Sequence, residues 1–468
     1  MHVPRGPFRS AVVISIFAAA TLLTACHKEQ GVTPSTAGTS ATPVASAPAP
    51  TAAPVKPPEC PPAGAVCGAS TCSEGITMAS TAIPNEDCPF RAAQAGVDIF
   101  SWNEFIALNW PAVSSSCSAD QKKSILDVRG GDGTTVVWQT YMPSDKVFVD
   151  PAKGKPATWC SGAGLLTANG VREFHHIAKA EPVAAKLGGA FLAIASPGHD
   201  VLQARGGIVT DQGNGDGKGG RWLRYEKLMN QVELDAIVSN NWWNKAGLKD
   251  KTVTLPVNSI EIKSAWKILT PAEKASNRYF TTEAVVYNTP DATEPIPGKV
   301  TLGLVGLHII QKTPTQAGFL WSTFEHVDTD KVFFDPKSNA APNTQLAKQP
   351  YVELNPDGTP HTPSTQIKRT HPDAGANRLN AYYQKLLGNS VFANYRLIST
   401  QWGTGTATLK GTPAYVSNIT METYVQDFEK PVKQGSDINA TGCFACHLNS
   451  VTSIGTSGDH SFFFLEAK

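Results

Sequence analysis

The sequence predicts an α+β fold in which an antiparallel, β-rich body precedes a helical C-terminal segment. The middle of the 468-residue chain holds runs of β-branched and aromatic residues, and Pro, Gly and Asn separate these runs as in an antiparallel meander. The stretches on either side of it repeat their apolar residues at helical spacing. Lys and Arg (40) nearly balance Asp and Glu (39), which argues against a nucleic-acid-binding protein.

Each predicted element follows from a local pattern. The strand-like runs are residues 259–269, 279–288, 299–312 and 318–328, and residues 301–310 are apolar enough for a central strand. Helical spacing covers residues 95–110, which Pro111 ends, and residues 376–387. Asn418 is a candidate N-cap for a short helix over residues 419–428. A turn at residues 131–133 is expected to lead into a strand with Thr135, Val137 and Gln139.

One motif carries specific chemistry. Cys443-Phe444-Ala445-Cys446-His447 has two cysteines three residues apart with a histidine directly after them, the attachment pattern of c-type haem. Each thiol adds to one vinyl group of the porphyrin, and His447 becomes the proximal iron ligand. The alternatives are a redox-active cysteine pair and half of a zinc site. No second Cys-x-x-Cys completes a zinc site.

The sixth iron ligand stays open at this stage. Only residues 448–468 follow the motif and none of them is methionine, so the haem is expected to pack against chain that precedes it. His460 and Met421 are the candidates nearest to the motif in sequence. More distant candidates are His308, His326, His361 and His371. A Met ligand would raise the potential, a His ligand would lower it, and an open position would admit oxygen, peroxide or substrate.

His308 and His326 fall in two neighbouring predicted strands. In a strand, His308 shares a face with Leu302, Leu304 and Ile310. The two imidazoles meet if the hairpin register is even and lie on opposite faces if it is odd. Buried or surface histidines without a ligand role remain the simpler interpretation of this pair.

The N-terminus has the features of an export signal. Arg5 and Arg9 precede an apolar run over residues 11–23, which ends at Leu23-Thr24-Ala25-Cys26, a pattern similar to a bacterial lipobox. Cys26 is then the lipidated first residue, and because His27 is not aspartate, an outer-membrane anchor facing the periplasm is expected. The alternative is an ordinary secretory signal. Residues 26–58, rich in Thr, Ala, Pro and Ser, predict a flexible tether.

Six further cysteines predict three disulfides of unknown pairing in an oxidising compartment. They are Cys60, Cys67, Cys72, Cys88, Cys117 and Cys160. A metal or cluster site is the alternative. The adjacent pair His175-His176 is interpreted as structural, and the loop at residues 211–220 as solvated, because it fails the EF-hand pattern. The domain division is therefore residues 1–25, signal peptide; 26–58, tether; 59–372, disulfide-linked body; and 373–468, helical haem segment packed on the body.

The segments LGLVGLHIIQKT, FLWSTFEHVD and NYRLISTQW, together with CFACH, resemble a group of exported bacterial cytochrome c family proteins. These proteins have one haem, a C-terminal Cys-x-x-Cys-His and a large uncharacterised body. The resemblance runs from about residue 100 to the end. It implies Cys443 and Cys446 as thioether sites and His447 as the proximal ligand, and no catalytic residue.

Three functions follow from these patterns. The first is a lipid-anchored monohaem cytochrome that transfers electrons between periplasmic partner proteins. The second is a haem-dependent oxidoreductase whose body binds an organic substrate or peroxide. The third is a redox- or gas-sensing lipoprotein without turnover. No HExxH motif or second haem motif is present to favour a different chemistry.

Overall fold

The computed structural model describes residues 80–85, 94–161, 172–174, 209–210, 221–286, 298–329, 374–403, 411–412, 416, 418–421, 432–434, 438–440, 442–448 and 450–468. All of them belong to one compact unit, Pro54–Lys468. The expected signal peptide, the whole tether and the loop at residues 211–220 lie outside the described residues.

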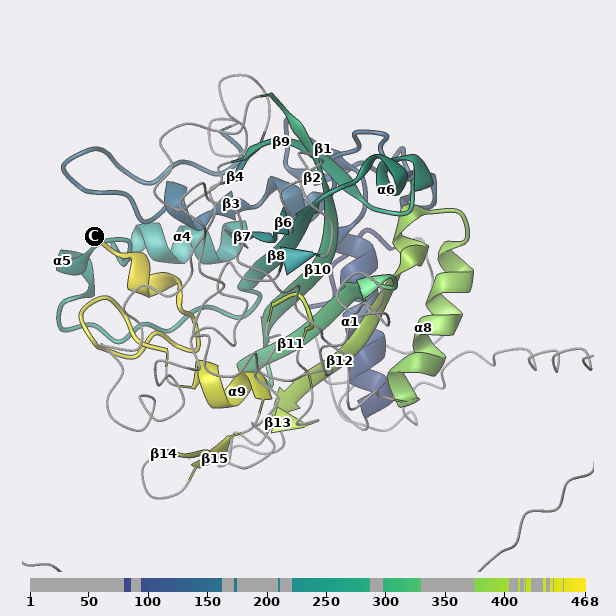
Figure 1. Ribbon diagram of the computed structural model, residues 1–468. Coiled ribbons are helices and arrows are strands. Elements are labelled where there is room, and N and C mark those ends of the chain that lie inside the picture. The colour runs from purple at the N-terminus through teal and green to yellow at the C-terminus, as the bar shows by residue number, and fades with distance from the viewer. Residues whose placement is uncertain are drawn as a thin grey trace, which may run out of the picture. The chain divides into compact units, whose positions relative to one another are not determined.

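One sheet organises this unit (Figure 1). Nine of the described strands join it, and all neighbours run antiparallel except the parallel pair β4–β9. In spatial order the strands are β13 (Gly411–Thr412), β12 (Tyr395–Gly403), β11 (Gln316–His326), β10 (Val300–Thr313), β8 (Ile260–Ile268), β7 (Arg224–Met229) and β3 (Met142–Pro143), with β9 (Thr281–Val286) beside β10 and β4 (Arg172–Phe174) beside β9. The α+β fold with an antiparallel, β-rich body is confirmed.

The four predicted strands are β8 to β11, but they do not form a simple meander. One edge of β10 pairs with β8. The other edge pairs with β9 at its N-terminal end and with β11 over the rest of its length. The helix α6 (Pro271–Ser276) carries the chain from β8 across to β9. Thr270 begins it, since its hydroxyl accepts the Glu273 amide at 3.1 Å while the Glu273 carboxylate accepts the Thr270 amide at 2.9 Å. As expected, β10 is central and almost wholly buried.

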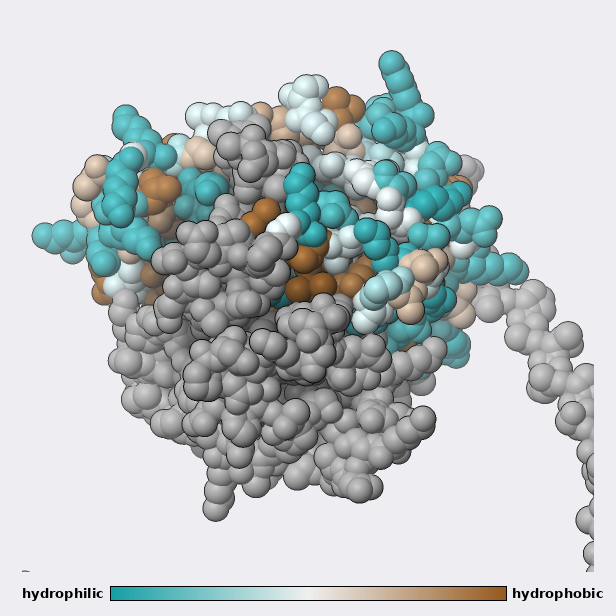
Figure 2. Space-filling view, turned by 45° about the horizontal axis from the view of Figure 1, so that its top comes forward, coloured by the Kyte–Doolittle hydropathy of each residue, from teal (hydrophilic) through white to brown (hydrophobic). Residues whose placement is uncertain are grey.

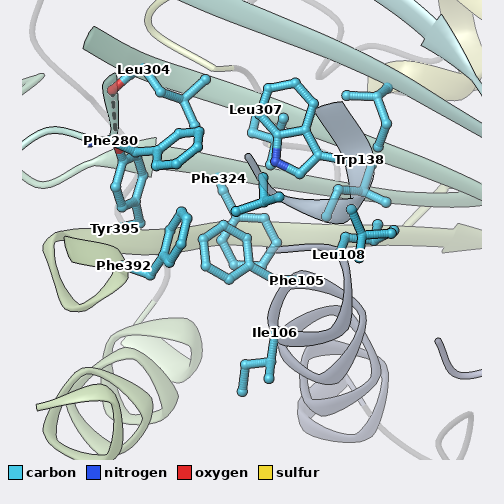
Figure 3. Close-up of a cluster of buried hydrophobic side chains, with 14 of the residues drawn as sticks. Phe105, Ile106, Leu108, Trp138, Phe280, Leu304, Leu307, Phe324, Phe392 and Tyr395 are labelled. Carbon is cyan, nitrogen blue, oxygen red and sulfur yellow. Dashed lines mark hydrogen bonds between the residues drawn. The ribbon is translucent and has the colours of Figure 1, made fainter. Parts of the chain in front are cut away.

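The helices α1 (Gln94–Leu108) and α8 (Ala374–Leu387) cover one face of the sheet. Both confirm the helical spacing in the sequence. Figure 3 shows Phe105 of α1 reaching the strands, where its ring stacks on Phe324 of β11 with centroids 4.3 Å apart. Trp102 stacks on Tyr383 of α8 with centroids 4.7 Å apart. These aromatic contacts join the two helices and the sheet into one core.

A second core lies against the opposite face. It combines Trp321 and Ile310 of the sheet with α4 (Gln231–Ser239), α5 (Lys245–Leu248) and the C-terminal stretch of the chain. Phe444 and Phe464 contribute from that stretch, and Trp242 packs edge-on against Phe464 with centroids 6.3 Å apart. The Cys-x-x-Cys-His motif therefore belongs to this side of the sheet.

A β-bulge between Leu304 and Gly306 changes which residues share a face of β10. Leu302 and Leu304 point into the α1–α8 core, and beyond the bulge Leu307 and Ile309 do so as well. His308 thus shares a face with Ile310 but not with Leu302 or Leu304, so the expectation from the sequence was wrong. The extra residue reverses the alternation of side chains.

The strand expected after residue 133 is absent, and the C-terminal segment is not helical throughout. Val137 and Gln139 lie in a 3-10 turn, η3 (Val137–Thr140), and not in a strand. The Thr140 hydroxyl donates to the Val137 carbonyl at 2.6 Å, which stabilises the turn. Residues 373–468 contain strands as well as helices: α8 and β12 are part of the main core, because α8 packs on β12 and β12 pairs with β11.

The remaining described elements are short: β1 (Ala112–Val113), β2 (Ser118–Ala119), η2 (Ile125–Asp127), η4 (Ser144–Lys146), β5 (Val209–Thr210), β6 (Arg221–Trp222), η6 (Val391–Asn394), β14 (Val432–Gln434), β15 (Ile438–Ala440) and η7 (Phe463–Glu466). Within the described part of the chain, no helix has the length and apolar character needed to cross a bilayer. Among the described residues on the face in Figure 2, hydrophilic side chains are the most prominent, and a small group of apolar ones is visible near the centre.

Candidate functional site

The Cys-x-x-Cys-His motif forms its own short helix, α9 (Gly442–His447). Residues three and four positions apart lie on one side of an α-helix, so positions 443, 446 and 447 fall on the same side of the α9 backbone. Cys443 and His447 are half-buried. Phe444 points the other way and is fully buried in the core against the sheet. The helix therefore buries Phe444 in the core and leaves Cys443 and His447 partly exposed.

Two contacts fix α9 on the sheet. The side chain of Gln401 in β12 accepts the Phe444 amide at 3.0 Å, which satisfies one of the amide groups that a helix start leaves unpaired. The ring of Phe444 lies 6.4 Å from that of Trp321 in β11, in an edge-on arrangement. Gln401 and Trp321 are register partners across β11 and β12, so α9 is held by a rigid pair of strands.

The imidazole of His447 is oriented by the main chain. Its Nδ1 lies 2.8 Å from the carbonyl oxygen of His460, which can only accept a hydrogen bond. Nδ1 therefore carries the proton, and Nε2 is the nitrogen with metal-ligand character. Trp321 and Phe462 flank the ring, with centroids 4.1 and 4.8 Å from its own. A histidine held in this way has a fixed tautomer and a fixed direction.

The loop that supplies this carbonyl has an unusual backbone. Asp459 and His460 both adopt left-handed conformations, with φ of 51° and 68°. The Asp459 carboxylate accepts the Leu255 amide and the Lys312 ammonium, each at 2.6 Å. These contacts over-determine the turn and hold the His460 carbonyl towards His447.

His460 itself lies on the His447 side of the site. Its carbonyl oxygen contacts Nδ1 of His447, the ring nitrogen opposite to the one that a metal would use. The His460 ring is set between Phe319 and Phe444, with centroids 6.4 and 6.3 Å away. Burial lowers the pKa of His460, and its Nδ1 has no hydrogen-bond partner among the described residues. This placement does not suit a sixth ligand.

His326 is a fully satisfied core histidine. Its Nε2 donates to the Arg278 carbonyl at 3.0 Å, and its Nδ1 accepts the Asp328 amide at 3.1 Å. The ring stacks on Tyr279 with centroids 4.0 Å apart. Burial lowers its pKa to about 4 and keeps it neutral. Both nitrogens being engaged, His326 does not offer a ligand atom.

His308 has a different environment. Its register partner is Thr323, an odd number of residues from His326, so the two histidines lie on opposite faces of the sheet. His308 instead shares a face with Trp321, because Trp321 is two residues from Thr323. Its Nδ1 lies 3.1 Å from the Thr323 hydroxyl, which orients the ring. Of the four histidine and methionine candidates that the structure describes, His308 is oriented on the face that carries α9.

Met421 lies in a separate apolar cluster. It is fully buried with Leu223, Tyr225, Val305 and Ile419. The main chain before it turns at Asn418, whose side chain accepts the Thr420 amide at 2.9 Å. The helix expected over residues 419–428 falls mostly outside the described residues, as do His361, His371 and the pair His175-His176.

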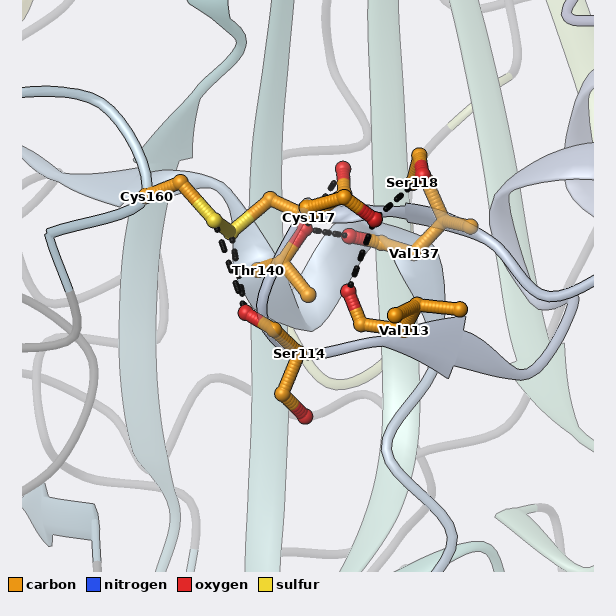
Figure 4. Close-up of a disulfide and its surroundings, with 8 residues drawn as sticks. Val113, Ser114, Cys117, Ser118, Val137, Thr140 and Cys160 are labelled. Carbon is orange, nitrogen blue, oxygen red and sulfur yellow. Dashed lines mark hydrogen bonds between the residues drawn. A yellow bond between two sulfur atoms is a disulfide. The ribbon is translucent and has the colours of Figure 1, made fainter.

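One of the expected disulfides is present. Cys117 and Cys160 are bonded, with Cα atoms 5.8 Å apart, and Figure 4 shows the bond close to Thr140 and Ser114. It joins the β1–β2 region to the chain beyond η4. Cys26, Cys60, Cys67, Cys72 and Cys88 lie outside the described residues.

The residue types of the motif are those that a c-type haem requires. A c-type haem takes two thiols and one imidazole from the chain, and Cys443, Cys446 and His447 supply these types within one short helix. Among the described residues no three His, Cys, Asp or Glu side chains gather as ligands of a metal ion.

Sequence reasoning missed the residues that support this motif. Gln401 and Trp321 gave no local signal, because their contacts with Phe444 and His447 join parts of the chain far apart in sequence. The sequence did contain a signal for Phe462, because it begins the apolar run after His460 that could cover a porphyrin ring. Comparisons with family models, curated proteins and solved structures found no match for this chain.

Proposed function

We propose that this protein is an exported c-type cytochrome that carries one covalent haem and transfers electrons. The observation that carries the proposal is the geometry of the motif: it is helical, so that positions 443, 446 and 447 fall on one side of its backbone, and the Nδ1 of His447 is engaged by a main-chain carbonyl. In this proposal Cys443 and Cys446 form the thioether bonds and His447 binds the iron through Nε2. The haem, when bound, supplies a one-electron couple.

The chain's own residues would tune that couple. The carbonyl bond to Nδ1 makes the imidazole more basic and prevents its rotation. Trp321 and Phe462 shield the ring from water. A protected, rigid ligand changes little between redox states, and a small structural change favours electron transfer over ligand exchange.

For the sixth position we propose His308. It shares a sheet face with Trp321, and Thr323 orients its ring. The same face also carries Lys263, the register partner of His308 in β8. Polar side chains on this face also suit the second candidate, a haem-dependent oxidoreductase that binds an organic substrate or peroxide. A redox or gas sensor with an open iron position is the third candidate function.

The absorption spectrum of the matured protein distinguishes these functions. A low-spin spectrum that cyanide and carbon monoxide leave unchanged supports the electron carrier, and a high-spin spectrum with rapid ligand binding supports the enzyme or the sensor. His308→Ala should convert low-spin protein to high-spin protein. The matched control is His326→Gln, which should leave the spectrum unchanged because His326 is satisfied in the core.

The proposal includes the cellular setting that the N-terminus predicts. Cys26 would carry the lipid, the outer membrane would be reached only through this anchor, and partner redox proteins in the periplasm would donate and accept the electron. Palmitate labelling of wild type and Cys26→Ala, followed by membrane fractionation, tests this part independently of the haem.

Covalent haem is tested by expression with a working cytochrome c maturation system. The wild-type band should stain for haem on a denaturing gel, and Cys443→Ala or Cys446→Ala should lose or weaken that stain. Cys117→Ser is the matched control, because it removes a thiol of the disulfide and leaves α9 intact. Wild-type protein whose intact mass lacks the macrocycle would refute the proposal.

A further inference from the structure

A cavity lies beside the disulfide, in a part of the molecule that the proposed function does not use. Its volume is about 290 Å³, and its walls come from the β1–β2 hairpin, η3, the start of α4, the stretch 80–85 and the chain around residue 159. An apolar cavity of about 150 Å³ is enough to bind benzene, so this one has room for a substituted ring. The apolar and aromatic side chains that line it are Ile83, Ala119, Val137, Tyr141, Trp159 and Val232.

The walls of the cavity are held by covalent and hydrogen bonds of the folded chain. Cys117 lines the cavity, and its bond to Cys160 fixes the residue directly after Trp159 (Figure 4). Asn230 caps α4 through its side chain, which fixes the helix start that forms another wall. A ligand therefore enters a site that is largely formed beforehand, and this lowers the entropic cost of binding.

Two of the lining side chains are aromatic and lie close together. The ring centroids of Tyr141 and Trp159 are 5.9 Å apart, and the two ring planes are tilted by 54°. At this angle neither ring covers the whole face of the other, so a third ring can join the pair through an edge-to-face contact. Trp159 is half-buried, and a ligand ring packed against it would remove more of its surface from water.

The lining of the cavity carries no formal charge. None of the described residues that line it is Asp, Glu, Lys, Arg or His. A charged ligand would lose part of its hydration in the cavity without meeting an opposite charge, and this loss is costly. The lining therefore favours a neutral ligand.

Most polar side chains of the lining are already bonded within the protein. Oδ1 of Asn230 accepts two main-chain amides, and its Nδ2 donates to a main-chain carbonyl at 2.7 Å. The Ser118 hydroxyl bonds to the Ser116 hydroxyl at 2.8 Å, and the Thr81 hydroxyl accepts from the Gln121 amide at 2.9 Å. A carbohydrate would leave many hydroxyl groups without a partner here, whereas an aromatic ring needs none.

We propose that this cavity is a binding site for a neutral molecule with one aromatic ring. The ring packs beside Tyr141 and Trp159 and against the apolar walls, and a polar substituent such as a hydroxyl group stays in water. None of the lining residues belongs to α9. The inference is therefore independent of the proposed haem, and the two can be tested separately.

Saturation-transfer difference NMR titrations of the full chain test the class of ligand. Benzyl alcohol should give a saturable signal. Benzoate has nearly the same size but a negative charge, and it should bind at least about tenfold more weakly. Cyclohexylmethanol is neutral but lacks the aromatic ring, and it should also bind more weakly. Equal binding of benzyl alcohol and either of the other two probes would overturn the inference, and so would absence of benzyl alcohol binding up to about 10 mM.

Two exposed valines of α4 offer a matched pair of variants that locate the site. Val232 lines the cavity and is 39% exposed, whereas Val238 is 42% exposed and does not line it. Val232→Asp brings a charge to the cavity and should weaken benzyl alcohol binding about tenfold, and Val238→Asp should leave it unchanged. Trp159→Ala removes one of the two rings and should abolish the signal. Equal affinities of the two aspartate variants would overturn the inference even if Trp159→Ala does not fold, since both valines lie at the surface.

Discussion

A buried acid in α1 offers a sharp test of the fold energetics. Glu104 is fully buried, the Ser322 hydroxyl donates to its Oε2 at 3.2 Å, and its Oε1 has no hydrogen-bond partner among the described residues. Burial raises the pKa of Glu104 from 4.5 to about 8. Glu104→Gln replaces this group with a neutral one of the same shape, so the variant isolates the cost of ionising it.

The size and sign of the effect follow from the two pKa values. Between about pH 4.5 and about pH 8 the unfolded chain has lost this proton and the folded chain keeps it, so the free energy of unfolding falls as pH rises. The interval from 4.5 to about 8, at about 1.4 kcal/mol per tenfold change, amounts to about 5 kcal/mol. Above about pH 8 no further loss from Glu104 is expected.

Urea unfolding of both proteins, followed by circular dichroism, measures this difference. The variant and the wild type should have similar stability near pH 4.5, and the variant should be the more stable by several kcal/mol near pH 8.5. Glu283→Gln is the control, because the Glu283 side chain is 51% exposed and its removal should not change the pH profile. A difference between Glu104→Gln and wild type that is independent of pH, or that grows towards acid, would refute the reasoning.

Three further predictions concern stability. The wild type should lose about 3 kcal/mol of its free energy of unfolding as pH falls from about 6.5 to about 4, because protonation of His326 favours the unfolded chain. His326→Gln should abolish this loss. Denaturation midpoints across the range measure it, and a loss of the same size in the variant would contradict the prediction. Gly306→Ala would place a Cβ 2.0 Å from the Thr420 hydroxyl and should lower the free energy of unfolding by about 1–3 kcal/mol. Gly154→Ala is the control: its Cβ would meet nothing within 4 Å, so the same urea titration should show almost no change. Cys117→Ser should lower the free energy of unfolding by about 2–4 kcal/mol by opening the disulfide, and an unchanged thermal midpoint would exclude a stabilising role for that bond.

Local patterns were sufficient to predict most of the central architecture. The strand-like runs became β8 to β11, and helical spacing around Trp102 and Tyr383 became α1 and α8. The pattern could not predict the bulge before Gly306, because one extra residue leaves composition unchanged and reverses the faces only when strands pair. For the same reason the sequence left the relation of His308 and His326 open, and the register placed them on opposite faces.

The candidate site divides in a similar way. The spacing of Cys443, Cys446 and His447 was visible at once, since it lies within five consecutive residues. The residues that hold the motif come from elsewhere in the chain: Gln401 accepts the Phe444 amide, and the Trp321 ring lies beside that of His447. Such contacts depend on the completed sheet, so no window along the sequence contains them.

The acceptor for His447 is a peptide oxygen, and this has a genetic consequence. A substitution at position 460 replaces the side chain and leaves the carbonyl in place, provided that the left-handed turn at residues 459–460 survives. Variation at this site would therefore be silent for the basicity of the imidazole. Only changes that alter the path of the loop, such as proline, which cannot adopt a positive φ, would disturb the hydrogen bond to His447.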